Sequence, residues 1–420
     1  MNSTTLYPPL MTEIAGQAIV ELVRQFGSPT YVYDAAKIVE RIEDLAAFDV
    51  VRYAQKALSN VNVLDLVRRS GAMVDAVSAG EIHRALAAGF EPTGDPPPIV
   101  YTADIFTHDA LDLCFKKNIP TNCGSPDMIE QLGQRAPGRE ITFRLNPGFG
   151  HGHSQKTNTG GEQSKHGIWH EQLAHCLQRA DHNGLSVTGL HMHIGSGTDT
   201  EHLGQVCAAM EKAALVAGRS IKSISAGGGL PVPYKDGEEY CDLSQYFELW
   251  DAARKRLEAE FGHKVSLEIE PGRYVSAESG YLIAEIRAVK QMGGNTFYLL
   301  DAGFNHLARP ILYGAYHPMA ICPADGSAQE RPTSEVVVGG PLCESGDIFT
   351  QHEGGFVATR ELPNAEVGDL LVIACAGAYS IAMASNYNSH PFPAEVMIED
   401  DTPRIIRRRQ TYEDLFAAEV

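Results

Sequence analysis

The feature that most constrains the fold is an alternation of sequence patterns between residue 36 and about residue 280. Short apolar or β-branched runs alternate with longer segments of helical period, which predicts strands followed by helices. Eight such units are typical of a parallel (β/α)8 barrel. We expect its strands at Val50–Lys56, Met73–Val77, Ile99–Thr102, Pro120–Cys123, Ile141–Asn146, Val187–His193, Ser223–Ala226 and Val265–Glu270. We expect helices between them, for example at Gly80–Ala88, Asp109–Lys117, Glu171–Asp181 and His202–Ala217.

The pattern changes after residue 280, where the helical period fades. The strand-like runs there are Tyr281–Gln291, Thr296–Leu300, Ser334–Val338, Asp369–Cys375, Ala394–Glu399 and Arg404–Arg408. They predict a second, mostly β domain, a barrel or a sandwich. Pro29–Tyr33 also has a strand pattern, and we expect it to pair with this domain because the barrel is complete without it. The predicted fold is an α/β barrel over residues 36–280 plus a β domain made of residues 1–35 and 281–420.

Composition excludes several classes of partner. The formal net charge of −19 argues against nucleic acid and anionic membranes. No stretch approaches the roughly 20 apolar residues of a membrane helix, and Met1–Thr5 lacks the basic start of a secretory signal. The eight cysteines include no C-x-x-C pair, so zinc sites and disulfide frameworks are not expected and a reducing cytoplasm fits.

Polar residues and glycines follow several predicted strands at their carboxyl ends. They are Lys56, Asp75, Asn146, His193, Gly227–Gly229 and Glu270. Active sites of (β/α)8 barrels lie at this end, and phosphate sites often use the loops after the seventh and eighth strands. The glycine triplet follows the seventh predicted strand, and the segment from Glu270 to Arg273 follows the eighth. The sequence therefore predicts an active site with a phosphate-binding corner.

The glycine triplet and the turn after Glu270 together indicate the ligand. Three glycines let backbone N–H groups approach a phosphate closely, and Arg273 can add positive charge. Glu270 can hold a proton on a ring nitrogen of the same ligand, and Lys56 can bind an aldehyde covalently. A phosphate, a ring nitrogen and an aldehyde together suit pyridoxal 5′-phosphate, so we expect this cofactor.

A long glycine-rich loop, residues 148–167, follows the fifth predicted strand. Loops of this length in compact domains often act as lids. Its histidines, His151, His153 and His166, suggest a metal site as the alternative. We favour a mobile loop and expect no metal, because no carboxylate or cysteine lies at ligand spacing.

A series of motifs extends through nearly the whole chain and carries a family resemblance. They are Tyr53-Ala54-Gln55-Lys56-Ala57, His191-Met192-His193-Ile194-Gly195-Ser196-Gly197, Gly227–Gly229, Glu270-Pro271-Gly272-Arg273, Arg309-Pro310 with Tyr313-Gly314, Cys343-Glu344-Ser345-Gly346-Asp347 and Gly377-Ala378-Tyr379. In order and wording the chain resembles the pyridoxal-phosphate-dependent amino-acid decarboxylases of the alanine-racemase fold group. Gln55 and Gly197 differ from the residues that are usual at these motif positions in that group, but neither supplies a reacting atom. The resemblance is greatest to the bacterial enzymes that convert meso-2,6-diaminopimelate to L-lysine and CO2, the last step of lysine biosynthesis.

The resemblance implies a set of cofactor-binding residues. They are Lys56, Asp75, His193, Ser196, Gly227, Gly228, Gly229, Glu270, Gly272, Arg273 and Tyr379. Lys56 would join the cofactor aldehyde, His193 would stack on the ring, and Asp75 would support the ring. Ser196 and Tyr379 would contact the phosphate end together with the glycines.

The resemblance also implies a set of substrate-binding residues. They are Arg273, Arg309, Tyr313, Glu344 and Tyr379. Arg309 and Tyr313, with Arg273, would bind the distal carboxylate of the substrate, a task that suits the bidentate geometry of arginine. Glu344 would pair with the distal ammonium group.

Lys56, His193 and Cys343 are the catalytic residues that the resemblance implies. Cys343 would protonate the carbanion left by departing CO2, since a thiol can donate and recover a proton near neutral pH. Cys343 and Glu344 would reach into the site of a partner subunit. The resemblance therefore implies a homodimer whose β domains contribute substrate and dimer-interface residues.

Each of these residues also has an ordinary structural role that competes with the functional one. Taken singly, Lys56 would be a surface lysine, Glu270 a carboxylate paired with Arg273, His193 a core residue and Cys343 an inert thiol. The pattern as a whole also allows a decarboxylase of ornithine, arginine or carboxynorspermidine, or a non-catalytic regulatory homologue. Ornithine has no distal carboxylate, and a non-catalytic relative would be expected to lose the lysine or the thiol. Alanine racemase shares the barrel but fits the length and the Cys343 motif poorly.

Overall fold

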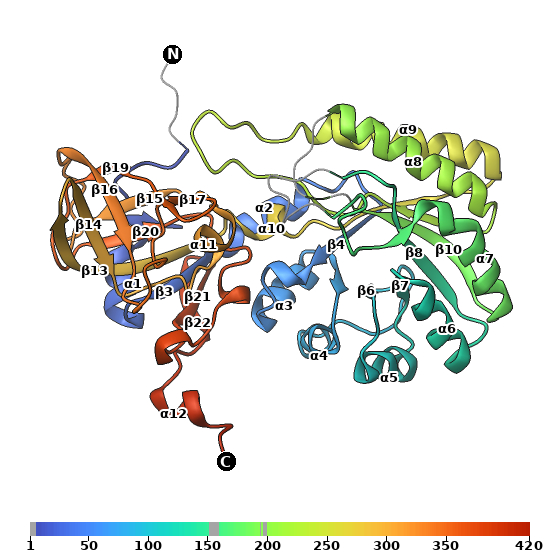
Figure 1. Cartoon of the computed structure of the whole chain (residues 1–420), viewed down its shortest axis with the longest axis horizontal. Coiled ribbons are helices and arrows are strands. Elements are labelled where there is room, and N and C mark those ends of the chain that lie inside the picture. Colours follow the sequence, from blue (N-terminus) through green and yellow to red (C-terminus); the bar gives the residue numbers. More distant parts are fainter. Residues whose placement is uncertain (1–5, 151–158, 194, 196–199) are drawn as a thin grey trace. The chain divides into compact units, whose positions relative to one another are not determined.

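Figure 1 shows the computed structural model of the chain, which describes residues 6–150, 159–193, 195 and 200–420. The chain forms two compact units. The barrel unit comprises Val39–Pro231 and Tyr240–Val275, and the β unit comprises Met1–Ile38, Val232–Glu239 and Ser276–Val420. The domain boundaries drawn from the sequence, at 36 and 280, remain a prediction.

Eight parallel strands form a closed ring in the barrel unit. They are β4 (Val50–Ala54), β5 (Met73–Ala76), β6 (Ile99–Ala103), β7 (Thr121–Cys123), β8 (Glu140–Asn146), β10 (Ser186–Met192), β11 (Ser223–Ser225) and β12 (Ser266–Ile269). Their hydrogen-bonded order is β10-β11-β12-β4-β5-β6-β7-β8, and pairing of β8 with β10 closes the ring. The predicted (β/α)8 barrel is thereby confirmed. A short further strand, β9 (Ile168–Trp169), pairs with the end of β8.

Helices lie outside the ring of strands (Figure 1). They are α3 (Val61–Arg69), α4 (Ala79–Ala87), α5 (His108–Lys117), α6 (Pro126–Arg135), α7 (Leu173–His182), α8 (Thr200–Ala217) and α9 (Leu243–Phe261). The chain passes from one unit to the other within α2 (Ala35–Glu43) and within α10 (Arg273–Ser276). Asn60, Ser78, Thr107 and Asp242 precede α3, α4, α5 and α9, and each side chain accepts a backbone N–H of the first turn. These caps explain where the helices begin.

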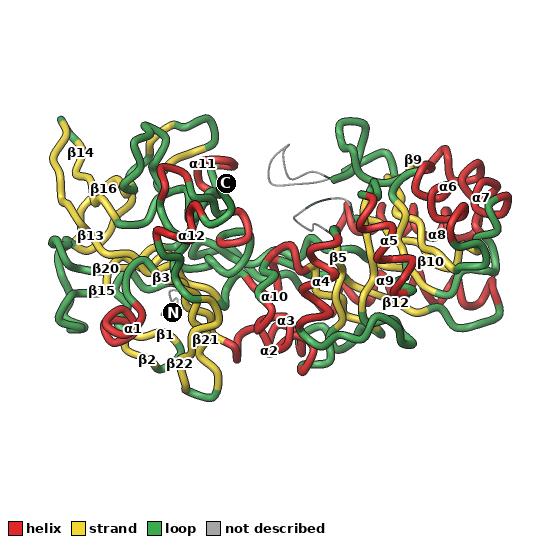
Figure 2. The backbone as a smooth tube through the Cα atoms, turned by 90° about the horizontal axis from the view of Figure 1, so that it is seen from below, coloured by secondary structure: helices red, strands yellow, loops and turns green. Residues whose placement is uncertain are grey.

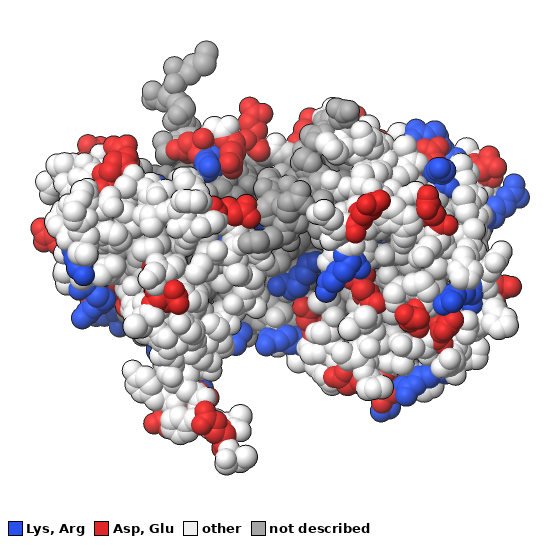
Figure 3. Space-filling model, viewed as in Figure 1, with Lys and Arg blue, Asp and Glu red and all other residues white. Residues whose placement is uncertain are grey.

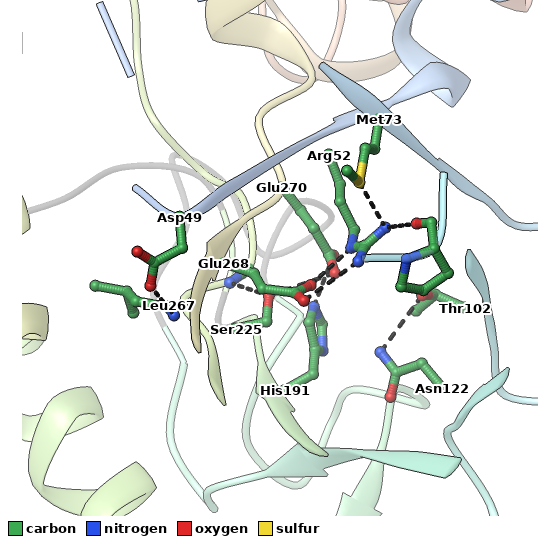
Figure 4. Close-up of polar contacts among 12 residues, drawn as sticks. Asp49, Arg52, Met73, Thr102, Asn122, His191, Ser225, Leu267, Glu268 and Glu270 are labelled. Atoms are coloured by element: carbon green, nitrogen blue, oxygen red, sulfur yellow. Dashed lines mark hydrogen bonds and ion pairs between the residues drawn. The ribbon is translucent and has the colours of Figure 1, made fainter. Parts of the chain in front are cut away.

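The barrel interior contains a buried ion pair. The Arg52 side chain is 2% exposed, and its Nε donates to Glu268 Oε2 at 2.6 Å. Its Nη1 donates to the carbonyl of Pro97 at 2.6 Å, so the buried guanidinium is both neutralised and hydrogen-bonded. Arg52 also places a positive charge near the carboxylate of Glu270 (Figure 4).

The β unit is organised around a mixed sheet of order β19-β16-β14-β13-β3-β21-β22, with β20 pairing with both β13 and β15. The strands are β3 (Thr30–Asp34), β13 (Gly280–Met292), β14 (Asn295–Leu300), β15 (Met319–Cys322), β16 (Thr333–Gly339), β19 (Arg360–Pro363), β20 (Leu370–Ile373), β21 (Ala394–Glu399) and β22 (Thr402–Arg407). Strand β3 pairs antiparallel with β13 and parallel with β21. The predicted strand at Pro29–Tyr33 therefore does join the second domain.

The sequence pattern misses several short elements of the β unit. They are β15, β19, the hairpins β1 (Glu13–Ile14)–β2 (Gln17–Ala18) and β17 (Gln351–His352)–β18 (Phe356–Val357), and the helices α1 (Ile19–Phe26), α11 (Arg309–Tyr313) and α12 (Tyr412–Phe416). Four residues are too few to show a clear alternation, and β15 is followed directly by Pro323. Figure 2 shows the strands of this unit in yellow and its short helices in red.

The two faces of β3 show how the β unit is packed. Val32 joins an apolar cluster that includes Ile19 and Leu22 of α1. Tyr31 and Tyr33 point to the opposite face, as the pleat of a strand requires, and both are fully buried. The hydroxyl of Tyr33 donates to Glu395 at 3.0 Å. The sheet therefore carries packed side chains on both faces.

Two features of the described chain bear on partners. None of its helices is long and apolar enough to cross a membrane. On the face shown in Figure 3, acidic and basic side chains are interspersed.

Candidate active site

Lys56 lies at the carboxyl end of the first barrel strand. Strand β4 leads into a 3-10 turn, Gln55–Ala57, and the Lys56 side chain in that turn is exposed. Its charge acts on Asp75, Glu81 and His193, which all lie at the same end of the barrel unit. The N–H of Ala54 donates to the carbonyl of Pro271 at 3.0 Å and so joins this turn to the segment after Glu270.

Glu270 is buried at the end of β12 and is held by two neighbouring strands (Figure 4). Its Oε2 lies 2.8 Å from Nε2 of His191, and Ser225 Oγ donates to its Oε1 at 3.4 Å. Burial alone would raise the pKa of Glu270. The charge and hydrogen bond of His191, with the charges of Arg52 and Arg144, outweigh burial and lower the pKa to about 2. Glu270 is therefore an anion fixed in place at neutral pH.

Asp75 lies at the end of β5 and behaves in the opposite way. It is 3% exposed, and among the described residues its Oδ1 has no hydrogen-bond partner. Burial and the charge of Glu270 raise the pKa of Asp75 to about 8, although Thr102 and Lys56 oppose the shift. One buried site thus contains an ionised and a protonated carboxyl group, which is how proteins assign separate acid and base roles.

The glycine triplet after β11 leaves no room for side chains. A Cβ at Gly227 would lie 2.3 Å from the carbonyl oxygen of Met192, and one at Gly228 would lie 2.4 Å from that of Glu270. Gly227 and Gly229 also have positive φ angles of 64° and 106°. The triplet is therefore a bare backbone corner between β10 and β12.

His193 contacts this corner directly. The N–H of Gly228 donates to His193 Nδ1 at 3.2 Å. Desolvation and the charges of Lys56 and Arg144 lower the pKa of His193 well below its usual value. His193 is consequently a neutral ring whose Nδ1 accepts from the glycine backbone, and its face can pack against a ligand.

The base of the loop at 148–167 is tied to the barrel by two side chains. Asn146 accepts the N–H groups of Gly148 and Gly161 at 3.1 and 2.9 Å. Asp104 Oδ2 lies 2.6 Å from His166 Nδ1, and its Oδ1 accepts the N–H of Gly167 at 2.8 Å. His166 is therefore paired with a carboxylate, whereas His151 and His153 lie outside the described residues. The lid role of the loop stays a prediction.

Arg309 lies in the β unit at the start of α11. It is 7% exposed, and its Nη1 donates to the hydroxyl of Tyr234 at 3.1 Å and lies 3.0 Å from His317 Nε2. Tyr313 ends the same short helix and is partly exposed. Two of the three residues predicted to bind the distal carboxylate, Arg309 and Tyr313, therefore lie on one helix.

Cys343 and Glu344 lie in a loop of the β unit that Asp347 organises. The buried carboxylate of Asp347 accepts the N–H groups of Phe304 and Leu342 at 2.7 and 2.8 Å. Cys343 is exposed, unlike most of the other seven cysteines, and all eight are free thiols. Glu344 is exposed beside it. Asp347 therefore holds an exposed thiol and an exposed carboxylate side by side in one loop.

The structure thus brings some predicted residues together and leaves others apart. Lys56, Asp75, His193, Gly227–Gly229 and Glu270 gather at one end of the barrel, with Gly272 and Arg273 following Glu270. Arg309, Tyr313, Cys343, Glu344 and Tyr379 belong to the β unit. Tyr379 has a positive φ of 58° in the turn after β20. Ser196 lies outside the described residues. The individual roles of all these residues stay predictions.

Sequence reasoning assigned no role to four polar residues that the structure places at this end of the barrel. They are Glu81, Asp104, Arg144 and His191. A signal existed for His191, because His191 and His193 are two positions apart on one strand and so point to the same side. The partner of Asp104 is 62 residues away in sequence, and no local pattern indicates it.

A (β/α)8 barrel with a bare glycine corner and a fixed carboxylate anion is the architecture of a pyridoxal-phosphate enzyme. Residues 35–277 match the family model described as pyridoxal-dependent decarboxylase, pyridoxal binding domain. A diaminopimelate decarboxylase of Escherichia coli K12 is 52% identical over 410 residues, which cover 97% of this chain and 98% of the relative. The chain belongs to the diaminopimelate decarboxylase family of pyridoxal-dependent decarboxylases.

Two solved structures agree in fold. A crystal structure of diaminopimelate decarboxylase is 53% identical, with a TM-score of 0.93 and 96% of each chain covered. A diaminopimelate decarboxylase from Helicobacter pylori, complexed with L-lysine, is 31% identical, with a TM-score of 0.84 and 95% and 98% of the two chains covered.

The cofactor of the family is pyridoxal phosphate, and the residues of the barrel unit fit it. The glycine corner, whose Cβ positions are blocked by backbone, can bring N–H groups to a phosphate. Glu270 presents a buried anion for a protonated ring nitrogen, and Asp75 has a buried oxygen with no partner among the described residues. An exposed lysine for the aldehyde, Lys56, lies at the same end.

Proposed function

We propose that this protein removes CO2 from meso-2,6-diaminopimelate and forms L-lysine, the last step of lysine biosynthesis. The observation that carries the proposal is the buried Glu270–His191 pair beside the glycine corner. The pair supports a site built for a protonated pyridine ring and its phosphate. Full-length similarity to diaminopimelate decarboxylases gives the substrate.

The residues of the barrel unit hold the cofactor. Lys56 would join its aldehyde, Gly227–Gly229 and Arg273 its phosphate, and His193 would pack on its ring. Glu270, ionised at neutral pH, keeps a proton on the ring nitrogen. When bound, pyridoxal phosphate supplies an electron sink for the charge left by departing CO2.

The residues of the β unit recognise the substrate. Arg309 can bind the distal carboxylate in bidentate geometry, and its present hydrogen bond to the hydroxyl of Tyr234 keeps the guanidinium oriented. Tyr313 would donate a second hydrogen bond, and Glu344 would pair with the distal ammonium group. A substrate without the distal carboxylate would lose this charged contact with Arg309, so it should be turned over poorly.

Cys343 would protonate the α-carbon after CO2 leaves. Its exposed position on the loop braced by Asp347 supports the further proposal that it acts in the site of a second subunit. The protein would then be a homodimer with two composite sites. We also propose that it acts in the cytoplasm, where its eight free thiols would stay reduced.

The test is release of CO2 from a panel of amino acids, with and without added pyridoxal phosphate. Turnover of meso-diaminopimelate to L-lysine that depends on the cofactor is expected. Preferred turnover of ornithine, arginine or carboxynorspermidine would replace the proposed substrate. A protein without cofactor absorbance or turnover would instead be a non-catalytic homologue.

A further inference from the structure

A cavity of about 350 Å³ lies within the β unit, and none of the residues that line it has been assigned to the cofactor or the substrate. Its walls come from the segment at 7–9, the segment Val232–Glu239, and strands β15 and β19 with their flanks. Three of the wall residues are tyrosines, namely Tyr7, Tyr234 and Tyr316. Such a lining offers apolar area together with hydroxyl groups.

Two cations of the cavity share one aromatic ring. The guanidinium carbon of Arg360 lies 3.7 Å from the ring centroid of Tyr316, and Nζ of Lys235 lies 5.0 Å from it. Arg360 Nη1 donates to the carbonyl of His317 at 2.9 Å. Within the described chain, neither cation has a carboxylate at ion-pair distance. Basic side chains near a protein surface commonly form an ion pair with a carboxylate. Two cations at the ring of Tyr316 without such a pair favour an anionic ligand.

One acid, Asp236, belongs to the same lining. Its Oδ1 accepts the N–H of Leu6 at 2.9 Å, and the carboxylate keeps a second oxygen. Glu361 follows Arg360 directly on β19, so its side chain points to the opposite face of the strand, where it accepts the hydroxyl of Thr333 at 2.6 Å. The lining therefore offers two positive groups and one negative group, which suits a ligand that carries both a carboxylate and an ammonium group.

We propose that this cavity binds a free α-amino acid. Arg360 and Lys235 receive its carboxylate, Asp236 faces its ammonium group, and its side chain lies against the tyrosine rings. The planar guanidinium of Arg360, already stacked on Tyr316, is oriented for bidentate contact with a carboxylate.

The cavity wall also touches Arg309. The hydroxyl of Tyr234 accepts from Arg309 Nη1 at 3.1 Å, and the Tyr234 ring lies 5.2 Å from the Arg309 guanidinium carbon. Glu238 fixes the turn by accepting the N–H of Tyr234 at 2.7 Å. An amino acid against Tyr234 therefore changes the surroundings of Arg309. This consequence rests on the proposed function and makes the cavity an effector site that alters the affinity for substrate.

The binding test uses the cofactor-loaded enzyme and titration calorimetry with each of the common α-amino acids at millimolar concentrations. Cofactor absorbance is followed in parallel, because an amino acid that enters the catalytic site changes that absorbance. We expect at least one amino acid to bind with heat but no absorbance change. Its N-acetyl and carboxamide derivatives, which each lack one charge, should not bind.

Three variants complete the test. Arg360→Gln should weaken binding by about tenfold or more, as expected for loss of a charged hydrogen-bond donor. Lys235→Gln changes an exposed side chain, and it should weaken binding several-fold. Arg287→Gln, an exposed β13 variant outside the cavity, is the matched control and should bind normally.

The outcomes separate the two proposals. Binding that survives both Arg360→Gln and Lys235→Gln, or no absorbance-silent binding by any amino acid, overturns the effector site. Absence of decarboxylation with intact absorbance-silent binding overturns the proposed function alone.

Discussion

Replacing His191 with Phe should destabilise the barrel unit through Glu270. His191 is 1% exposed, and its Nε2 is the nearest polar partner of that buried carboxylate at 2.8 Å. The pKa of Glu270 is about 2 against an ordinary 4.5, a difference of about 2.5 units. At about 1.4 kcal/mol per unit this corresponds to about 3–4 kcal/mol, and His191 is the largest favourable contributor. Removing one partner of a buried charged pair typically costs about 3–5 kcal/mol of folding stability. For His191→Phe we expect the free energy of unfolding to fall by about 2–4 kcal/mol.

Urea unfolding of the cofactor-free protein, followed by tryptophan fluorescence, measures this loss. The two tryptophans, Trp169 and Trp250, both lie in the barrel unit and report on it specifically. His175→Phe, an exposed site on α7, is the matched control and should cost less than about 0.5 kcal/mol. In a Glu270→Gln background the His191→Phe loss should shrink, because the buried charge has gone.

The pH dependence follows from the sign of the shift. A lowered folded-state pKa stabilises the folded protein above the unfolded value of 4.5, and this stabilisation is lost as the pH falls toward about 2. The His191→Phe cost should therefore be full at neutral pH and shrink in that acid window. A loss below about 1 kcal/mol at pH 7, or an equal loss in the Glu270→Gln background, would refute the role assigned to His191.

The remaining predictions concern the paired carboxyl, the cofactor corner and the subunit arrangement. The pKa of Asp75 is raised to about 8, so the folded protein keeps a proton there that the unfolded chain loses at about pH 4. The stability of the cofactor-free protein should therefore fall between about pH 4 and 8 by up to about 1.4 kcal/mol per pH unit. In Asp75→Asn, the urea midpoint of unfolding should depend less on pH over the same range. Gly228→Ala should weaken pyridoxal phosphate binding about tenfold or more in a fluorescence titration, since a forced backbone shift costs about 1–3 kcal/mol. Gly204→Ala is the control and should bind normally, because a Cβ at Gly204 would meet open space. Lys56→Ala and Cys343→Ala should each be inactive alone. If the two subunits of a dimer share each site, a refolded equal mixture of the two variants should recover about a quarter of wild-type activity. No recovery would mean that each subunit supplies both residues of its own site.

The barrel could be predicted because its strands are buried on both faces. Runs such as Ile99–Thr102 are almost continuously apolar and end at turn residues, so they stand out from the helices between them. Strands of four residues, such as β15 and β19, carry too little pattern for this. The placement of Val232–Glu239 in the β unit also had no sequence signal, because a polar segment after a strand has the pattern of an ordinary loop.

The site residues that directly follow a strand could be predicted from the sequence. The protonation states and hydrogen bonds that depend on residues distant in sequence could not. Glu270 and the glycine triplet follow their strands directly. The pairing of Glu270 with His191 joins residues 79 apart in sequence, and it decides which carboxyl is ionised. From its sequence position alone, Asp75 would be expected to be an ordinary anion. Its raised pKa follows only from burial beside Glu270.

The most direct test of the proposed chemistry is to locate the residue that binds the cofactor. The protein is loaded with pyridoxal phosphate, reduced with borohydride, digested, and its peptides are analysed by mass spectrometry. We predict a single modified lysine at Lys56, and no modified peptide from Lys56→Ala. A stable modification of any other lysine, or none in the wild-type protein, would contradict this prediction.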